Sequence, residues 1–471
     1  MQIAVFSRKH ILRCAVALLI AAATLTAKAQ QKQYHRPNII LIVADDLGWK
    51  DLAFMGSRFY ETPNLDKLAK QSLIFTNGYA AAANCAPSRA CMLTGLNTPR
   101  HGIYTVGTSE RGNAKTRKII PTPNKNVLDR RFTTLPAVLK QAGYLTAIIG
   151  KWHLSNDPLL YGFDINKGGT HQGHPPSYFS PYKIPALEDG KPGEYLTDRL
   201  TNEAISFLEE NRNKAFFLYL PYYAVHSPLQ APDGLVKKYG QKQKAPGQAN
   251  AVYAAMIENM DMNAGRLLNK LQELKLDSNT LVIFTSDNGG IRATSHQTPL
   301  RAGKGSYYEG GIRVPLAFHW PGRIKPAVTS EPVTNMDFFP TLLDLLAINK
   351  DTLQLDGQSM LPVLNGGTMA TRPLYWHYPV YLQAYDKKED QAQDPLFRTR
   401  PGSSMRLGNW KLHQYFEDNA FELYNLERDP GEQQNLAASE PQMLAKLKAM
   451  LQQWQRDVNA PVPQQPNPQY P

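Results

Sequence analysis

The sequence predicts an α/β fold in which a large, mostly parallel central sheet lies between helices. Four short apolar runs are rich in β-branched and aromatic residues and lack polar alternation, which indicates strands buried on both faces. Each run is followed by polar residues, and segments with helical spacing lie between the runs. The predicted strands of this sheet are 38–44, 144–150, 216–220 and 281–286.

The predicted helices separate these strands along the chain. Segment 134–142 has Pro136 near its start and Gly143 beyond its end, as is typical of a short helix. Segments 198–211 and 253–274 also have apolar residues at helical spacing. Because strands and helices alternate, we expect helices on both faces of the sheet.

After about residue 355 the pattern changes to that of a smaller C-terminal α+β subdomain with an antiparallel sheet. Its predicted elements are strands at 405–412 and 421–426 and a helix at 442–458. We therefore assign residues 30–355 to the large N-terminal domain and residues 356–460 to the C-terminal subdomain. The Pro- and Gln-rich tail, residues 461–471, is expected to be disordered.

Residues 1–29 are typical of a secretory signal peptide. A basic start is followed by an apolar run, 15–25, that is short for a bilayer span, and Ala27-Lys28-Ala29 offers a cleavage site. An uncleaved anchor helix is the alternative. Since no later apolar run is long enough to cross a membrane, we expect an exported mature chain, periplasmic or secreted, without stable membrane insertion.

The composition describes a basic chain without a disulfide framework. The 471 residues carry a formal net charge of +12. A basic balance favours encounters with polyanions, and charge alone does not choose between an anionic glycan, nucleic acid and an anionic membrane. Three cysteines occur; Cys14 lies in the predicted signal peptide, and Cys85 and Cys91 remain. We expect Cys91 to be a small buried hydrophobic residue.

Polar residues follow the predicted strands at their carboxyl ends, where α/β sheets bind ligands. Asp45 and Asp46 follow the first strand, and Asp287 and Asn288 follow the last. Three carboxylates and one amide form an all-oxygen set suited to Ca²⁺ or Mg²⁺, and adjacent carboxylates repel each other without a cation. No Cys/His cluster indicates zinc. Either pair alone has the alternative role of a helix cap or turn.

Basic residues and histidines occur in similar positions. Lys151 and His153 lie in G-K-W-H-L after the second strand, His226 lies in A-V-H-S-P after the third, and Lys304 lies in R-A-G-K-G-S-Y-Y-E-G-G. Taken singly, such residues are more often ordinary strand-end or surface groups. A histidine suits general acid catalysis, and lysines suit an anionic transition state. The convergence of separate segments on one sheet edge indicates a site.

The most specific string is Cys85-Ala86-Pro87-Ser88-Arg89, followed by Leu93-Thr94-Gly95. This C-x-P-S-R-x-x-x-L-T-G pattern resembles the signature of the formylglycine-dependent, type I sulfatases of the alkaline-phosphatase-like superfamily. A buried structural cysteine in an Ala-rich turn is the alternative. The resemblance includes the strings above and an E-L-Y-x-L-x-x-D-P-x-E-x-x-N-L run at 422–436, and it extends from about Pro37 to Leu436.

The resemblance implies an alkaline-phosphatase-like sulfatase fold and a sulfuric ester hydrolase. It implies that a formylglycine-generating maturation enzyme oxidises Cys85 to 3-oxoalanine (formylglycine), whose hydrated form supplies the nucleophile. It also implies one divalent cation, usually Ca²⁺ and alternatively Mg²⁺. The residues that match the family's metal ligands are Asp45, Asp46, Cys85, Asp287 and Asn288.

The basic residues acquire roles by the same resemblance. Arg89 is expected to orient the nucleophile, and Lys151 and Lys304 to bind the sulfate group. His153 matches the residue that takes the proton when the aldehyde is regenerated. His226 matches the residue that protonates the leaving alcohol.

A sulfated carbohydrate is the expected substrate, and nucleic acid is not an expected partner. The run at 193–201 is similar to segments of bacterial carbohydrate sulfatases, and we favour a galactose or N-acetylgalactosamine sulfate. A phosphate or phosphonate ester hydrolase of the same superfamily and an inactive secreted glycan-binding protein are the alternatives. Candidate sugar-binding residues in loops are His171, His174, Arg292, His296, Trp376 and His377.

Overall fold

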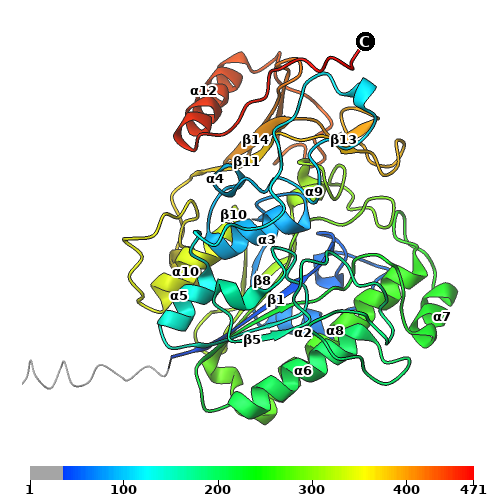
Figure 1. Cartoon of the computed structure of the whole chain (residues 1–471), viewed down its shortest axis with the longest axis vertical. Coiled ribbons are helices and arrows are strands. Elements are labelled where there is room, and N and C mark those ends of the chain that lie inside the picture. The colour runs from blue at the N-terminus through cyan, green and yellow to red at the C-terminus, as the bar shows by residue number, and fades with distance from the viewer. Residues whose placement is uncertain (1–35) are drawn as a thin grey trace, which may run out of the picture. The chain divides into compact units, whose positions relative to one another are not determined.

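A central sheet lies between helices in this computed structural model (Figure 1). Its eight strands have the order β5-β4-β6-β1-β7-β8-β2-β9. The structure describes residues 36–471, so the predicted signal peptide at 1–29 lies outside the described residues. The strands of the sheet are β1 (Asn38–Ala44), β2 (Leu73–Phe75), β4 (Leu145–Ile149), β5 (Ile165–Lys167), β6 (Phe216–Pro221), β7 (Thr280–Ser286), β8 (Leu316–His319) and β9 (Ala327–Thr329).

The sheet is mostly parallel, as predicted. β5, β4, β6, β1 and β7 run parallel to one another, whereas β8 is antiparallel to both β7 and β2. In the centre, Ile40 of β1 is paired with Leu218 of β6 and Val282 of β7. The five parallel strands therefore present their carboxyl ends at one edge of the sheet, where ligands bind in such folds.

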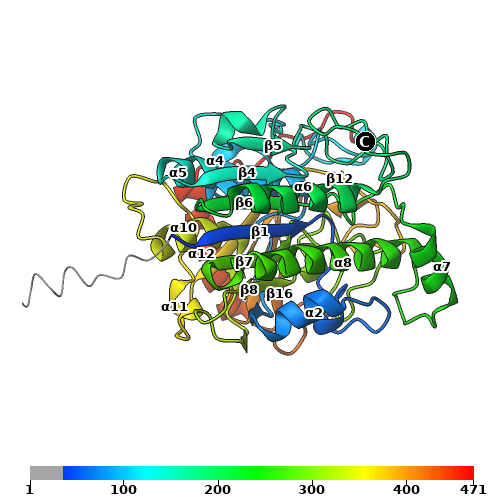
Figure 2. The same cartoon turned by 90° about the horizontal axis from the view of Figure 1, so that it is seen from below.

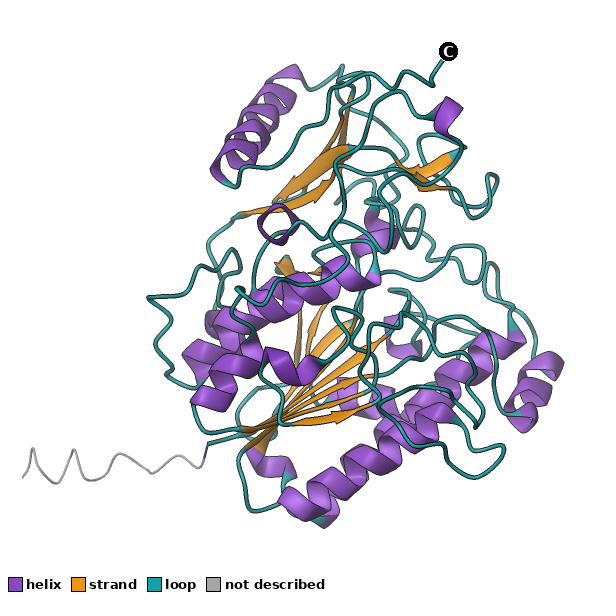
Figure 3. Cartoon of the chain, viewed as in Figure 1, coloured by secondary structure: helices purple, strands orange, loops and turns teal. Residues whose placement is uncertain are grey.

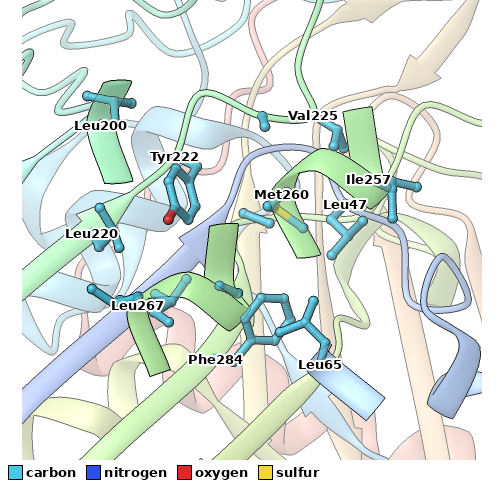
Figure 4. Close-up of a cluster of buried hydrophobic side chains, with 14 of the residues drawn as sticks. Leu47, Leu65, Leu200, Leu220, Tyr222, Val225, Ile257, Met260, Leu267 and Phe284 are labelled. Carbon is cyan, nitrogen blue, oxygen red and sulfur yellow. The ribbon is translucent and has the colours of Figure 1, made fainter. Parts of the chain in front are cut away.

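Helices cover both faces of the sheet (Figure 3). Ile40 and Ile42 enter one hydrophobic core, which Figure 4 shows, and Ile39 and Leu41 enter the other. The first core contains residues of α2 (Pro63–Lys70), α6 (Leu196–Asn211) and α8 (Ala251–Glu273), which lie in front of the sheet in Figure 2. The second contains residues of α3 (Cys85–Thr94), α5 (Leu135–Gln141) and α10 (Phe338–Leu345). This arrangement confirms the predicted α/β class.

A second sheet forms the C-terminal part, again as predicted. Its strands are antiparallel, in the order β11 (Pro373–Tyr378), β14 (Gly402–Leu407), β15 (Trp410–Tyr415) and β16 (Phe421–Asn425). Helix α12 (Pro441–Asp457) packs on this sheet through Leu447 and Leu451. Because residues 38–471 form one structural unit, the domain boundary at residue 355 stays a prediction.

The remaining elements are short. None of the helices within residues 36–471 combines the length and hydropathy needed to cross a bilayer. Two strand pairs lie outside the main sheets, β3 (Gly78–Tyr79) with β10 (Val333–Thr334) and β12 (Leu382–Gln383) with β13 (Phe397–Thr399). The short helices are α4 (Thr98–His101), α7 (Asp233–Gln241), α9 (Glu309–Ile312) and α11 (Leu361–Leu364).

The prediction that the tail at 461–471 is disordered is wrong. The amide of Ile120 donates to the carbonyl of Gln465 at 2.9 Å, and the amide of Asn467 donates to the carbonyl of Lys118 at 2.9 Å. The Asn467 side chain also donates to the carbonyl of Ala114. Main-chain pairing of this kind does not depend on apolar side chains, so a composition rule does not detect it.

A fully buried ion cluster joins the C-terminal sheet to α9. The Lys411 ammonium of β15 lies 2.8 Å from Glu309 and 3.0 Å from Glu432, and all three side chains have no exposed surface. The Tyr79 hydroxyl donates to Glu309, and His413 lies 3.0 Å from Glu432. Burial alone raises the pKa of Glu309, but Lys411 and neighbouring arginines outweigh it and lower that pKa to about 2.

We expect Lys411→Met to lower the free energy of unfolding by about 3–5 kcal/mol, because it removes the ammonium group that pairs with two buried carboxylates. Denaturant unfolding followed by circular dichroism measures this loss. Lys446→Met, which removes an exposed lysine from α12, is the matched control and should change stability by less than about 0.5 kcal/mol. Equal stabilities of the two variants would contradict the prediction.

Candidate active site

The polar residues predicted at the strand ends meet at the carboxyl edge of the central sheet. Asp45 and Asp46 follow β1, and Asp287 follows β7. Lys151 and His226 follow β4 and β6, which are the next strands on the other side of β1. Adjacent parallel strands end side by side, and this explains why residues far apart in the sequence lie in one cluster.

Cys85 lies at the centre of this cluster, at the first residue of α3. Its side chain is buried, and its Sγ lies 3.4 Å from Asp45 Oδ1, 3.7 Å from Asp46 Oδ1 and 3.4 Å from Lys304 Nζ. Cys85 is a free cysteine, as is Cys91, which is buried against Met336 and lies 3.4 Å from a histidine nitrogen. The prediction that Cys91 is a small buried residue is confirmed.

Each of the three carboxylates has a basic partner. Lys151 Nζ lies 2.6 Å from Asp45 Oδ2, and Lys304 Nζ lies 2.6 Å from Asp46 Oδ2. Arg89 Nε donates to Asp287 Oδ2 at 2.8 Å. Lysine and arginine side chains therefore offset part of the expected repulsion between these carboxylates, although burial, and to a smaller extent Asp287, still raise the pKa of Asp45.

One oxygen of Asp45 and one of Asp46 lie near the thiol, and the amide oxygen of Asn288 has no hydrogen-bond partner among the described residues. The ligand atoms of Asp45, Asp46, Cys85 and His226 all lie within 4.8 Å of one another and form a potential metal-binding group. Asn288 Oδ1 is buried and has no hydrogen-bond partner within residues 36–471. Asp287 lies outside this group of four; its Oδ2 accepts a hydrogen bond from Arg89, and its Oδ1 accepts the backbone N–H of Asp46. The carboxylate oxygens of the two aspartates and the amide oxygen of Asn288 suit a hard divalent cation.

His226 and His153 approach the cluster with different surroundings. His226 Nε2 lies 3.5 Å from Asp46 Oδ2, and its Nδ1 lies 2.7 Å from the carbonyl oxygen of Ser227. Burial and the charge of Lys304 lower the pKa of His226, whereas Asp46 acts in the opposite direction. Burial and the charge of Lys151 lower the pKa of His153 well below its usual value.

Two residues of the site have left-handed backbone conformations. Asp46 has φ 61° and His153 has φ 64°, values that are uncommon for residues other than glycine. Such conformations cost free energy and persist where the surrounding structure enforces them. Their position at the strand ends, beside the buried thiol, is consistent with a functional constraint on the backbone.

The predicted sugar-binding residues lie in different surroundings in the structure. The ring of His174 stacks on that of His226, with centroids 6.1 Å apart, so this residue lies at the site. His171 is exposed on the same loop, and His296 pairs with Glu389 at 3.1 Å. Arg292 lies in the loop after β7 and is buried.

The prediction that Trp376 and His377 lie in loops near the site is wrong. Both residues belong to β11 and are buried. Trp376 donates its indole N–H to the carbonyl of Ala80, and the two ring nitrogens of His377 face Ser403 and the carbonyl of Pro461. Their polar atoms have partners within the protein, and both side chains lie in the interior rather than in a loop.

Sequence reasoning missed Asp51, which supports the turn after β1. Its carboxylate accepts hydrogen bonds from the backbone N–H of Gly48 at 2.9 Å, from Tyr253 at 2.7 Å, and from Ser295 and Gln297. These bonds tie the Asp45-Asp46 turn to α8 and to the loop after β7. A buried aspartate seven residues after a strand has no distinct sequence signal, because similar positions are common in surface turns.

Comparisons with known proteins agree with this geometry. A family model described as Sulfatase matches residues 37–348, and a model described as N-sulphoglucosamine sulphohydrolase, C-terminal, matches residues 303–457. A protein named Sulfatase from Formosa agariphila is 32% identical, and the match covers 94% of this chain and 93% of that protein.

Two further relatives have named substrates or bound sugars. Human N-acetylgalactosamine-6-sulfatase is 32% identical, with 91% of this chain and 87% of that protein covered. The crystal structure of Ps i-CgsB in complex with k-i-k-neocarrahexaose has a TM-score of 0.72 at 30% identity, covering 89% of this chain and 93% of that one. Since the Sulfatase model matches more than half of the sequence and these relatives match nearly all of it, the chain belongs to the sulfatase family of sulfuric ester hydrolases.

Proposed function

We propose that this protein hydrolyses sulfate esters of a carbohydrate at the site around Cys85. The observation that carries the proposal is the position of the thiol, buried between Asp45, Asp46 and Lys304 at the carboxyl edge of the sheet. A nucleophile made at this position would lie beside both the acidic groups and a positive charge. Sulfate transfer requires these features, because negative charge must be stabilised where the bond to the leaving oxygen breaks.

We further propose that Cys85 is matured to formylglycine and that a divalent cation, Ca²⁺ or alternatively Mg²⁺, occupies the adjacent donor set. When bound, the cation would stabilise negative charge on the nucleophile and on a sulfate oxygen. Asp45, Asp46, Asp287 and Asn288 would hold it together with residue 85. The unpartnered Asn288 Oδ1 and the thiol-facing oxygens of the two aspartates support this assignment.

In this proposal the two lysines of the site bind the sulfate group of the substrate. Lys151 and Lys304 each neutralise one aspartate at 2.6 Å. A cation on the aspartates would reduce the need for these contacts, and both ammonium groups would then be available to the sulfate group. Arg89 keeps Asp287 in place and adds positive charge beneath the nucleophile.

The proposed substrate is a sulfated galactose or N-acetylgalactosamine unit of a glycan. One relative is named N-acetylgalactosamine-6-sulfatase, and another has been crystallised with a neocarrahexaose. The basic balance of the chain favours a polyanionic substrate. We also propose that residues 1–29 direct export, so that the mature protein meets such glycans in the periplasm or outside the cell.

Sulfate release from defined sugars tests the proposed function. The protein is produced together with a formylglycine-generating enzyme and mixed with the 4- and 6-sulfates of galactose and N-acetylgalactosamine. We expect release from at least one of them, detected by ion chromatography. Treatment with EDTA should abolish release, and added Ca²⁺ should restore it and raise the melting temperature, because ligand binding to the folded state stabilises it.

A matched phosphate ester of the preferred sugar is the control for the main alternative. Faster hydrolysis of the phosphate than of the sulfate would reject the proposed reaction in favour of a phosphoesterase. Release that persists after full removal of divalent cations would reject the cation. Binding of the sulfated sugars without any release, in protein that contains formylglycine, would favour the inactive glycan-binding protein.

A further inference from the structure

Arg292 is a buried arginine with two guanidinium nitrogens that have no hydrogen-bond partner among the described residues. Only 7% of its surface is exposed, and neither its Nε nor its Nη1 has a hydrogen-bond partner within residues 36–471. A guanidinium group has five N–H donors and keeps its charge, so burial without acceptors costs free energy. Burial also lowers the pKa of Arg292 below its usual value, despite the attraction of Glu389 and Asp390.

The position of Arg292 links it to the active site. The backbone N–H of Lys304 donates to the carbonyl of Gly290 at 2.8 Å, so the loop after β7 and the segment that carries Lys304 run against each other. Contact is closest at Gly303, where a Cβ atom would lie 2.8 Å from the backbone nitrogen of Arg292. The backbone of Arg292 therefore lies beside Gly303, which precedes the lysine that contacts Asp46 and Cys85.

The two carboxylates that act on Arg292 are already engaged elsewhere. Glu389 Oε2 lies 3.1 Å from His296 Nε2. The Asp390 carboxylate accepts the backbone N–H groups of Tyr385 at 2.6 Å and of Asp386 at 3.2 Å. Both acids belong to the segment between β12 and β13, and neither forms an ion pair with Arg292 among the described residues. The arginine thus keeps donors for an oxyanion from outside the protein.

We propose that Arg292 binds a second anionic group of the substrate, carried by the sugar next to the one whose sulfate is removed. The inference rests on the proposed function, since it assigns a neighbouring subsite to that reaction. A sulfate ester and a uronate carboxylate offer the same chemistry, because a planar guanidinium binds either oxyanion through two N–H groups. The segment between β12 and β13 borders this subsite, and its acids would disfavour an anion placed on their side.

The test measures how strongly wild type and Arg292→Gln prefer a substrate with a second anionic group, either a sulfate or a carboxylate, over one without it. The substrates are a monosulfated disaccharide, the same disaccharide with a second sulfate on the neighbouring sugar, and a counterpart with a uronate there. We expect the ratio of kcat/KM for each doubly anionic substrate to that for the monosulfated one to fall about 10- to 100-fold in Arg292→Gln, mainly through KM. The larger of the two falls identifies sulfate or carboxylate as the natural group.

Arg212→Gln is the matched control, because it removes the same charge from an exposed residue that precedes β6, at the opposite edge of the sheet. Its ratios should equal those of wild type. Arg292→Lys should recover part of the lost discrimination, since it restores charge but not the two parallel donors. Unchanged ratios in Arg292→Gln would overturn the proposal.

A stability measurement separates this proposal from a structural role and from failure of the proposed function. Arg292→Met should melt at the same temperature as wild type or higher, because it removes an uncompensated buried charge; a clear decrease would indicate a structural arginine. If wild type releases no sulfate from any substrate, the proposed function fails. In that case the melting temperature tests the anion site on its own. An increase caused by the doubly anionic disaccharides in wild type, and none in Arg292→Gln, would support the site.

Discussion

Cys85→Ala is expected to reduce sulfate release by about 10⁴-fold or more, because the proposed nucleophile is made from this side chain. Cys85→Ser should be equally inactive in a host whose maturation enzyme accepts only cysteine. The fold should survive, since the thiol makes only weak contacts at 3.4–3.7 Å with Asp45, Asp46 and Lys304. Sulfate release and melting temperature are measured on the same preparations.

Cys91→Ala is the matched control for this experiment. Cys91 lies on the same helix, α3, and is also fully buried, but it packs against Ala81 and Met336 rather than the carboxylates. Its removal should cost about 1 kcal/mol of stability and leave turnover nearly unchanged. Mass spectrometry of the peptide around Cys85 in wild type should detect formylglycine. Turnover near the wild-type rate in Cys85→Ala would show that the residue is not the source of the nucleophile.

The sequence predicted the central sheet well because its strands are continuous apolar runs. β1 has the predicted bounds of 38–44, and β4, β6 and β7 differ from their predictions by one residue at one or both ends. Burial on both faces removes polar residues from these strands, so the runs are visible without structural information. The same argument does not apply to β2, β8 and β9, which are short and lie towards one edge.

Helix α3 was not predicted, although it carries the most specific string of the chain. All ten of its residues are buried, including Ser88 and Arg89. A helix that is enclosed on every side has no polar face, so the periodicity that identifies α6 or α8 is missing. The motif therefore located the site, whereas its secondary structure became apparent only from packing against η5 (Asn335–Asp337) and α10.

The sequence analysis identified residues of the candidate site but not the ion pairs between them. Strand ends and short strings identified Asp45, Asp46, Lys151 and Lys304, yet nothing in the sequence pairs each aspartate with one lysine. Such pairing depends on three-dimensional distances between residues that are more than one hundred positions apart. Trp376 was assigned to a loop incorrectly, because no strand was predicted at 373–378, whereas these residues form β11 and Trp376 is buried in it.

His226→Ala is expected to slow hydrolysis of a sugar sulfate by about 10²- to 10⁴-fold and to have a clearly smaller effect on an activated aryl sulfate. A sugar alkoxide is strongly basic and needs a proton as its bond to sulfur breaks, whereas a nitrophenolate needs little help. His226 lies at the carboxyl end of β6 with its Nε2 towards Asp46, and the carbonyl oxygen of Ser227 lies against its other ring nitrogen. This arrangement leaves Nε2, on the side of the ring that faces the carboxylate cluster, as the nitrogen that would carry the proton.

The comparison of the sugar sulfate with the aryl sulfate also controls for indirect effects of the His226 substitution. A folding defect or a loss of the cation in His226→Ala would lower both rates by the same factor, because neither depends on the leaving group. Only loss of a proton donor makes the loss of rate grow with the basicity of the leaving oxygen. A series of aryl sulfates of increasing phenol pKa therefore gives the slope of the logarithm of the hydrolysis rate against that pKa. A slope equal to that of wild type would remove His226 from the role of general acid and direct attention to His174, whose ring stacks beside it at the same end of the sheet.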